Sequence, residues 1–189
     1  MLKTLVKGCE PTRGSKYSAA VDLYASEDCI IAAGETKIIG LGVAIDLDYI
    51  KYKDAELDED GRYNLVGSEL NVSEEKLNDW LNVFMIRHYL ELHPRSSLRA
   101  KGLISNTGII DLDYEDEIKI IIRNPIRTES IVNTLRVYQY KEELDAFNFD
   151  YKIKKGDKIA QITLIEHKVH LFGINTDEDR TGGFGSTGK

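Results

Sequence analysis

Residues 108–122 read GIIDLDYEDEIKIII. The first half of this stretch places two carboxylates, Asp111 and Asp113, and the ring of Tyr114 directly behind a glycine turn. The second half, Glu117–Ile122, is rich in isoleucine, and runs of β-branched residues favour an extended strand. A polar turn that leads into such a strand predicts a sheet protein with chemistry-bearing side chains at a strand end.

Short apolar runs of the same kind recur along the chain between turn signals such as Gly34-Glu35 and Gly156-Asp157. Proline is scarce, with 3 among 189 residues, which suits extended strands. Many short strands at close spacing predict an all-β barrel or sandwich. The expected strands are Leu2–Val6, Ser18–Ala25, Cys29–Ala32, Lys37–Ile39, Gly42–Leu47, Tyr89–Leu92, Glu117–Ile122, Thr134–Tyr140, Tyr151–Ile153, Lys158–Ile165 and Val169–Phe172.

One segment has helical rather than strand periodicity. Ser73 is a good N-cap residue, two glutamates follow it, and apolar residues then recur at helical spacing at Leu77, Trp80, Leu81 and Phe84. We therefore expect a mostly helical insertion near 73–87. An amphipathic helix must bury its apolar stripe, here either against the barrel or against another protein.

The whole chain, 1–189, is predicted to be one domain with two insertions, at about 49–88 and 125–150. Within the first insertion, Lys51–Leu70 is charged and weakly patterned, which indicates a long surface loop or a hairpin. The second insertion has room for a short helix near Glu142–Asn148. The polar, glycine-rich residues 175–189 are expected to form a mobile C-terminal arm.

The composition excludes several classes of protein. A net charge of −7 argues against a protein that coats nucleic acid or lies on an anionic membrane. No apolar run approaches the roughly 18 residues that a membrane helix needs. The two cysteines, Cys9 and Cys29, are not spaced as a zinc or redox pair, which fits a reducing compartment. We expect a cytoplasmic protein without stable nucleic-acid binding.

Four further stretches carry polar groups that packing alone does not require. Asp22 lies inside an apolar strand, and residues 94–98 place Pro, Arg and two hydroxyls at a strand end. Residues 156–161 form a turn that enters another strand. Residues 180–188 combine an arginine, hydroxyls and an aromatic ring with glycines.

Together and in this order, the five stretches resemble the five motifs of the trimeric dUTP diphosphatases (dUTPases). The resemblance implies a distorted jelly-roll β-barrel that forms a homotrimer, with each active site shared between subunits. It implies hydrolysis of dUTP to dUMP and pyrophosphate with Mg²⁺ as cofactor. The two insertions are similar to those of phage-encoded members, in some of which extra segments bind a regulatory protein.

The resemblance also implies roles for individual residues. Asp111 is the expected catalytic residue that activates or orients the attacking water, although the residues alone favour a turn aspartate that caps backbone amides. Asp22 is expected to hold a water on the Mg²⁺, so its metal contact is indirect. Tyr114 is expected to lie under the deoxyribose and to exclude a 2′-hydroxyl. The expected phosphate contacts are Arg95, Ser96, Ser97 and Gln161.

The remaining expected substrate contacts come from two segments. A hairpin that includes residues 105–110 is expected to bind uracil through Asn106, Gly108 and Ile110. In the C-terminal arm, Phe184 is expected to stack on the uracil, and Gly185 to let the backbone approach closely. The residues expected to reach the γ-phosphate are Arg180, Ser186 and Thr187.

Some positions depart from the family pattern. Ala20 stands where glycine is usual, Asp116 stands where the family pattern Tyr-x-Gly has its glycine, and the fifth motif is one residue short. Two other functions therefore stay open. One is a dCTP deaminase-related enzyme, since that group shares the Arg95–Leu98 pattern, and the other is a binding module whose insertions contact a regulatory protein.

Overall fold

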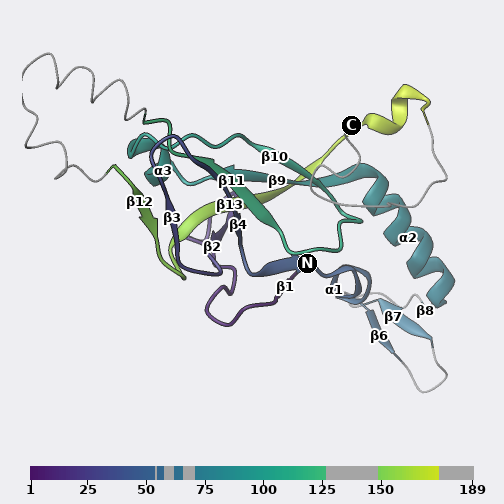
Figure 1. The fold of residues 1–189 in the computed structure, drawn as a ribbon. Helices are drawn as coiled ribbons and strands as arrows, with labels where there is room; N and C mark the ends of the chain where they lie inside the picture. Colours follow the sequence, from purple (N-terminus) through teal and green to yellow (C-terminus); the bar gives the residue numbers. More distant parts are fainter. Residues whose placement is uncertain (54, 58–61, 66–70, 127–148, 175–189) are drawn as a thin grey trace, which may run out of the picture.

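Strand β13 (Lys158–Glu166) is hydrogen-bonded along both of its edges. One edge pairs with β9 (His88–Pro94) and the other with β2 (Val21–Tyr24), while β10 (Gly108–Asp111) extends the sheet beyond β9. All three pairings are antiparallel, in the order β10-β9-β13-β2. This four-stranded sheet is the centre of the protein (Figure 1).

The computed structural model describes residues 1–53, 55–57, 62–65, 71–126 and 149–174. The other described strands form smaller antiparallel units, and these do not join the central sheet into a continuous closed barrel. They are β1 (Leu2–Thr4) with β5 (Val43–Ile45), β4 (Thr36–Gly40) with β11 (Lys119–Arg123), β3 (Cys29–Ile31) with β12 (Tyr151–Ile153), and the set β6 (Ala55–Leu57), β7 (Tyr63–Leu65) and β8 (Asn71–Val72).

Side chains alternate between the core and the surface along these strands. In β9, Leu90, Leu92 and Pro94 are buried, whereas Glu91 and His93 between them are only half-buried. Successive side chains of a strand point to opposite faces, so one apolar face suffices to fix which side packs inward. The prediction of a mainly β protein with one helical insertion is therefore confirmed.

The predicted helix is α2 (Glu74–Arg87), and the Ser73 side chain caps it by accepting a hydrogen bond from the backbone N–H of Lys76. Most of its apolar stripe is covered by the protein itself. Leu77 is buried, and Leu81 and Phe84 pack against the main core. Trp80 stays 43% exposed at the edge and stacks on Phe84, with ring centroids 5.4 Å apart.

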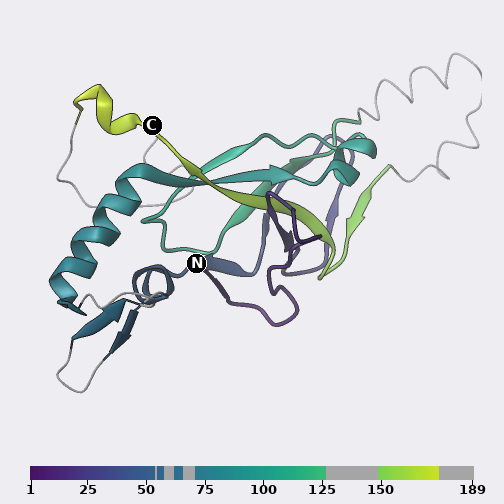
Figure 2. The same ribbon diagram turned by 180° about the vertical axis from the view of Figure 1, so that it is seen from behind.

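The described residues of the first insertion before α2 lie beside it at one end of the molecule (Figures 1 and 2). They include α1 (Leu47–Tyr52) and the hairpin β6–β7, so the hairpin alternative for this stretch is correct. Lys51 Nζ and the Tyr52 hydroxyl both donate to Glu74 Oε1, at 2.9 and 3.0 Å. Both bonds lower the pKa of Glu74, and the bond from Lys51 has the larger effect. They also join α1 to the first turn of α2.

Two predicted strands differ from the structure for local reasons. The predicted strand Gly42–Leu47 stops at Ile45, because the Asp46 side chain accepts a hydrogen bond from Tyr49 N at 2.9 Å and starts α1. The predicted strand Val169–Phe172 is a 3₁₀ helix. β13 ends at Glu166, which pairs with His88 at the start of β9, so the residues that follow have no further residue of β9 to pair with.

The ends of the second insertion are held together by Asn124, one of two buried polar residues in the described part of the chain. Its side-chain amide donates to Ile31 O at 3.2 Å and to Phe149 O at 2.8 Å. The predicted strand Thr134–Tyr140 and the predicted helix Glu142–Asn148 lie outside the described residues. Within the described ranges, no helix has the length and apolar character to span a bilayer.

The packing of α2 predicts a difference between two substitutions on its opposite faces. Leu77→Ala should lower the free energy of unfolding by about 2–5 kcal/mol, since it empties a buried site. Val83→Ala, at a position 50% exposed, should change it by less than about 0.5 kcal/mol. Urea unfolding at one fixed protein concentration measures both. Equal effects of the two variants would show that α2 is not packed on the protein as described.

Candidate active site

A buried carboxylate lies between two cations on the central sheet. Asp22, on β2, is 4% exposed. Arg95, directly after β9, donates from Nη1 to Asp22 Oδ1, and Lys158, at the start of β13, donates from Nζ to Asp22 Oδ2 at 3.2 Å. A buried carboxylate needs such partners, because desolvation of an unpaired charge is very costly.

The cluster leaves positive charge facing solvent. One carboxylate balances only one of the two cations, and the side chains of Arg95 and Lys158 are 33% and 47% exposed. The hydrogen bond to Asp22 is the main cause that raises the pKa of Lys158, and the nearby Tyr24 adds to it. Lys158 is therefore charged at neutral pH, and the two side chains keep donors for an anion.

Three more predicted phosphate contacts lie in the same region. Gln161, on β13, stands opposite Asp22 of β2 and opposite His93 of β9. Ser96 and Ser97 are exposed in the first turn of α3 (Ser96–Ala100). Arg95 N donates to Ile159 O at 3.0 Å, which fixes the start of this turn on β13. The fold thus brings the first, second and fourth motifs together.

Lys158 is a residue that strand periodicity misses. Lys158 and Gln161 are three positions apart, so a regular strand would place them on opposite faces. The register of β13 against β2 shifts between Lys158 and Ala160, as in a β-bulge, and both Ile159 and Ala160 are buried. The extra residue returns Lys158 to the face of Gln161. The turn signal Gly156-Asp157 directly before Lys158 is the only hint of it in the sequence.

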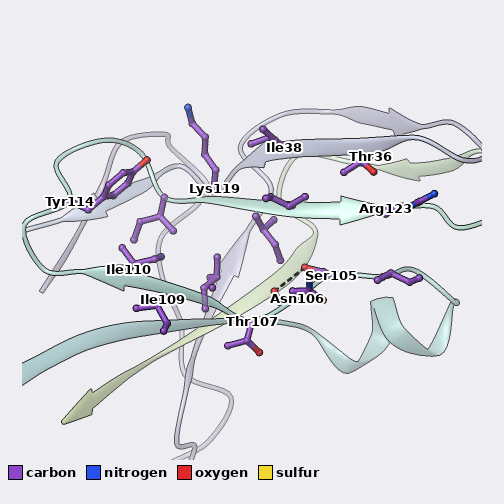
Figure 3. Close-up of a pocket in the computed structure, with 16 residues that line it drawn as sticks. Thr36, Ile38, Ser105, Asn106, Thr107, Ile109, Ile110, Tyr114, Lys119 and Arg123 are labelled. Carbon is purple, nitrogen blue, oxygen red and sulfur yellow. Dashed lines mark hydrogen bonds between the residues drawn. The ribbon is translucent and has the colours of Figure 1, made fainter. Parts of the chain in front are cut away.

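A second feature is a cavity of about 790 Å³ between β10 on one side and β11 and β4 on the other (Figure 3). The predicted uracil-binding residues Asn106, Gly108 and Ile110 line it, together with Tyr114. Figure 3 shows Tyr114 at one end of the cavity and Asn106 towards the other. The lining is mainly apolar, with Lys119 and Arg123 on the β11 side.

Asp111 lies apart from the cation cluster. It is exposed at the end of β10, where it pairs with Tyr89 at the start of β9, and its backbone carbonyl accepts a hydrogen bond from Tyr114 N at 3.1 Å. Arg95 follows Tyr89 by six residues. At roughly 3.3 Å per strand residue, Asp111 is about 20 Å from the Arg95 backbone. One chain does not bring them together.

The remaining predicted contacts, Arg180, Phe184, Gly185, Ser186 and Thr187, lie outside the described residues. Among residues that are described, no three His, Cys, Asp or Glu side chains gather as a metal-binding group. A direct Mg²⁺ contact fits Asp22 poorly, since each of its oxygens already faces a cation. A carboxylate has about four lone-pair sites, so a contact through water still fits.

Comparison with known proteins relates this chain to dUTPases. The family model described as dUTPase matches residues 83–138. The deoxyuridine 5′-triphosphate nucleotidohydrolase of Debaryomyces hansenii is 30% identical over 188 residues, covering 95% of this chain and 80% of the relative.

Solved structures of phage enzymes share the fold. The dUTPase of Staphylococcus bacteriophage 80alpha matches with a TM-score of 0.54 and 18% identity, over 97% of this chain and 96% of the other. A mutant dUTPase from phage phi11 of S. aureus, described with a coordinated structural Mg(II) ion, matches with a TM-score of 0.53 and 16% identity, over 98% and 97%. These likenesses confirm the predicted jelly-roll fold.

The cation cluster predicts a specific titration. Asp22→Asn removes the carboxylate to which Lys158 donates, so the pKa of Lys158 should fall back towards its ordinary value of 10.5. The pKa of Lys158 is raised in the folded protein. Its ion pair with Asp22 therefore stabilises the fold fully below about pH 10.5, and this stabilisation is lost as the pH rises through the pKa of Lys158 in the folded protein. NMR titration of lysine side chains labelled with ¹³C measures it.

Asp28→Asn is the matched control, because Asp28 is an exposed carboxylate that accepts from Lys155 N and lies outside the cluster. This substitution should leave the pKa of Lys158 unchanged. If the pKa of Lys158 were as high in Asp22→Asn as in the wild type, Asp22 would not be the partner that raises it.

Proposed function

This chain belongs to the dUTPase family, and from that premise we propose that it hydrolyses dUTP to dUMP and pyrophosphate. The observation that carries the proposal is the Asp22-centred pair of cations, Arg95 and Lys158, on the same sheet as Gln161. The reaction would lower the dUTP available for incorporation into DNA and would supply dUMP.

The phosphate half of the proposed site is the cation cluster. A nucleoside triphosphate carries about four negative charges, and its cleavage needs cations and donors fixed on the phosphate oxygens. Arg95 presents a planar set of donors suited to paired oxygens, and Lys158 supplies a point charge beside it. The pairing with Asp22 holds both cations in place before the substrate arrives, which reduces the ordering needed on binding.

The nucleoside half is the cavity behind β10. Its apolar walls suit a planar base, and the backbone groups of residues 106–110 supply directional hydrogen bonds. Tyr114 at the end of this cavity is the residue we propose to face the deoxyribose. A ring in van der Waals contact with C2′ would leave no space for a 2′-hydroxyl, so UTP should be rejected.

Asp111 is the proposed base. It would take a proton from a water that attacks the α-phosphorus in line with the leaving pyrophosphate. The new bond joins the water oxygen to the α-phosphorus, the bond from that phosphorus to the bridging oxygen breaks, and its electron pair leaves with pyrophosphate. The products are dUMP, pyrophosphate and one proton, which passes from Asp111 to solvent.

We propose Mg²⁺ as the cofactor, carried on the phosphates rather than on a cage of protein ligands. When bound, Mg²⁺ would neutralise charge that develops on the phosphate oxygens. Asp22 is the side chain that fits a contact to its hydration shell through water. The family resemblance and the Mg(II) ion described for the phi11 relative support this assignment.

The separation of the two halves supports a homotrimer with shared sites. Arg95 and Asp111 are at opposite ends of β9 and β10, too far apart for one chain to place both on one phosphate. A second copy that contributes Asp111 and its cavity would complete the site. A third would supply the arm with Arg180, Phe184, Gly185, Ser186 and Thr187.

The other expectations stay predictions. A regulatory protein that contacts the insertions is supported by the 80alpha relative, whose description states that phage dUTPases control transfer of virulence genes. The packing of α2 on its own core means that such a partner would use the outer face of the insertion. A cytoplasmic location and the lack of stable nucleic-acid binding are proposed from the sequence.

Pyrophosphate release tests the function directly. With Mg²⁺, the protein should release pyrophosphate from dUTP and far less from dCTP, dTTP and UTP. Asp111→Asn should lose roughly 10²–10⁴-fold in rate while still binding dUTP, because only the proton transfer is removed. Asp113→Asn, two residues away, is the matched control.

Several results would contradict the proposal. Ammonia release from dCTP would support the deaminase alternative instead. Equal cleavage of all four nucleotides would reject the cavity as the base-binding site. An Asp111→Asn enzyme as active as the wild type would reject that residue as the base.

A further inference from the structure

Glu117 joins the turn behind β10 to a distant part of the chain. Its carboxylate Oε1 accepts a hydrogen bond from Gly42 N at 2.7 Å, across 75 positions of sequence. Gly42 lies in the bend between β4 and β5 with a φ of +65°, a conformation that favours glycine. The distance of 2.7 Å is at the short end for an N–H···O bond, so this link holds the two segments closely together.

The glycine at position 40 makes room for the Glu117 carboxylate. A Cβ atom on Gly40 would lie 2.5 Å from Glu117 Oε1 and 2.7 Å from Ser26 Oγ. Real side chains do not approach so closely, so any side chain at position 40 would push the carboxylate away. The carboxylate therefore occupies a place that the bend leaves open for it.

Backbone bonds hold the same two segments in register. Leu41 N donates to Ile118 O at 2.9 Å, and Ile118 N donates to Val43 O at 2.8 Å. With the side-chain bond of Glu117, these contacts fix residues 117 and 118 on the β4–β5 bend. The main-chain position of Glu117 is therefore fixed by hydrogen bonds to the β4–β5 bend and not only by contacts within its own turn.

Tyr114 takes its position from this fixed residue. Its hydroxyl donates to the backbone carbonyl of Glu117 at 3.3 Å, and the side chain is only 7% exposed. Its own N–H donates to Asp111 O at 3.1 Å. Glu117 is thus connected to the ring that lines the cavity and, through Tyr114, to the backbone of Asp111.

We propose that Glu117 is a positioning residue that holds Tyr114 against the sugar and so sets the preference for deoxyribose over ribose. The proposal rests on the proposed dUTP hydrolysis. Glu117 need not touch the substrate, because it acts through the ring of Tyr114. A ring that is free to move gives way to a 2′-hydroxyl, so loosening it should cost selectivity more than it costs turnover.

The test measures kcat/KM for dUTP and UTP side by side. Glu117→Ala should reduce the dUTP-to-UTP ratio by about tenfold or more, approaching the ratio of Tyr114→Ala. Glu117→Gln should keep most of the ratio, since its amide oxygen can still accept from Gly42 N. Glu115→Ala is the matched control, an exposed glutamate in the same turn, and should keep the full ratio.

Tyr114→Phe provides a second variant that does not depend on how well Glu117→Ala folds. It keeps the ring and removes only the hydroxyl that donates to Glu117 O, so the ratio should fall in the same direction. An unchanged ratio in a folded Glu117→Ala, or in Tyr114→Phe, would overturn the proposal. A wild-type protein that cleaves no dUTP would instead reject the proposed function, which keeps the two failures distinct.

Discussion

The pairing of β13 along both edges is the constraint on which the proposed phosphate site depends. It places β2 and β9 on either side of one strand, so Asp22, Arg95 and Gln161 meet although they are far apart in sequence. The register shift after Lys158 adds a second cation to the same carboxylate. Burial of Asp22 then makes a cationic partner necessary, because an unpaired carboxylate there would destabilise the fold.

Much of the fold follows from local pattern. The strand Tyr151–Ile153 and the helix that begins after Ser73 lie where periodicity and capping place them. The errors arise where a neighbour decides the outcome. Val169–Phe172 has the composition of a strand but lies beyond the end of the β13–β9 pairing, and Asp46 ends a strand early by capping α1. Pattern describes what a segment can form, whereas partners determine what it does form.

Less of the candidate active site than of the fold can be predicted from sequence pattern. Asp22 stands out in the sequence as an acid within an apolar strand, and the structure gives the reason in its two cations. Lys158 was missed because a bulge changes its face, and Glu117 because its partner Gly42 is distant in sequence. The chemical roles themselves came from the family resemblance. Periodicity places a side chain on a face and carries no information on what a ligand requires.

The central claim is that the phosphate half and the Asp111 half of each active site come from different chains. Arg95→Gln and Asp111→Asn chains, co-expressed with two different tags and purified through both, test it most directly. Each variant alone should be nearly inactive towards dUTP. The mixed trimers should regain about a third of wild-type activity, because one site in each would combine an intact Arg95 with an intact Asp111. Mixed trimers without activity would contradict the claim and would place both halves of the site on one chain.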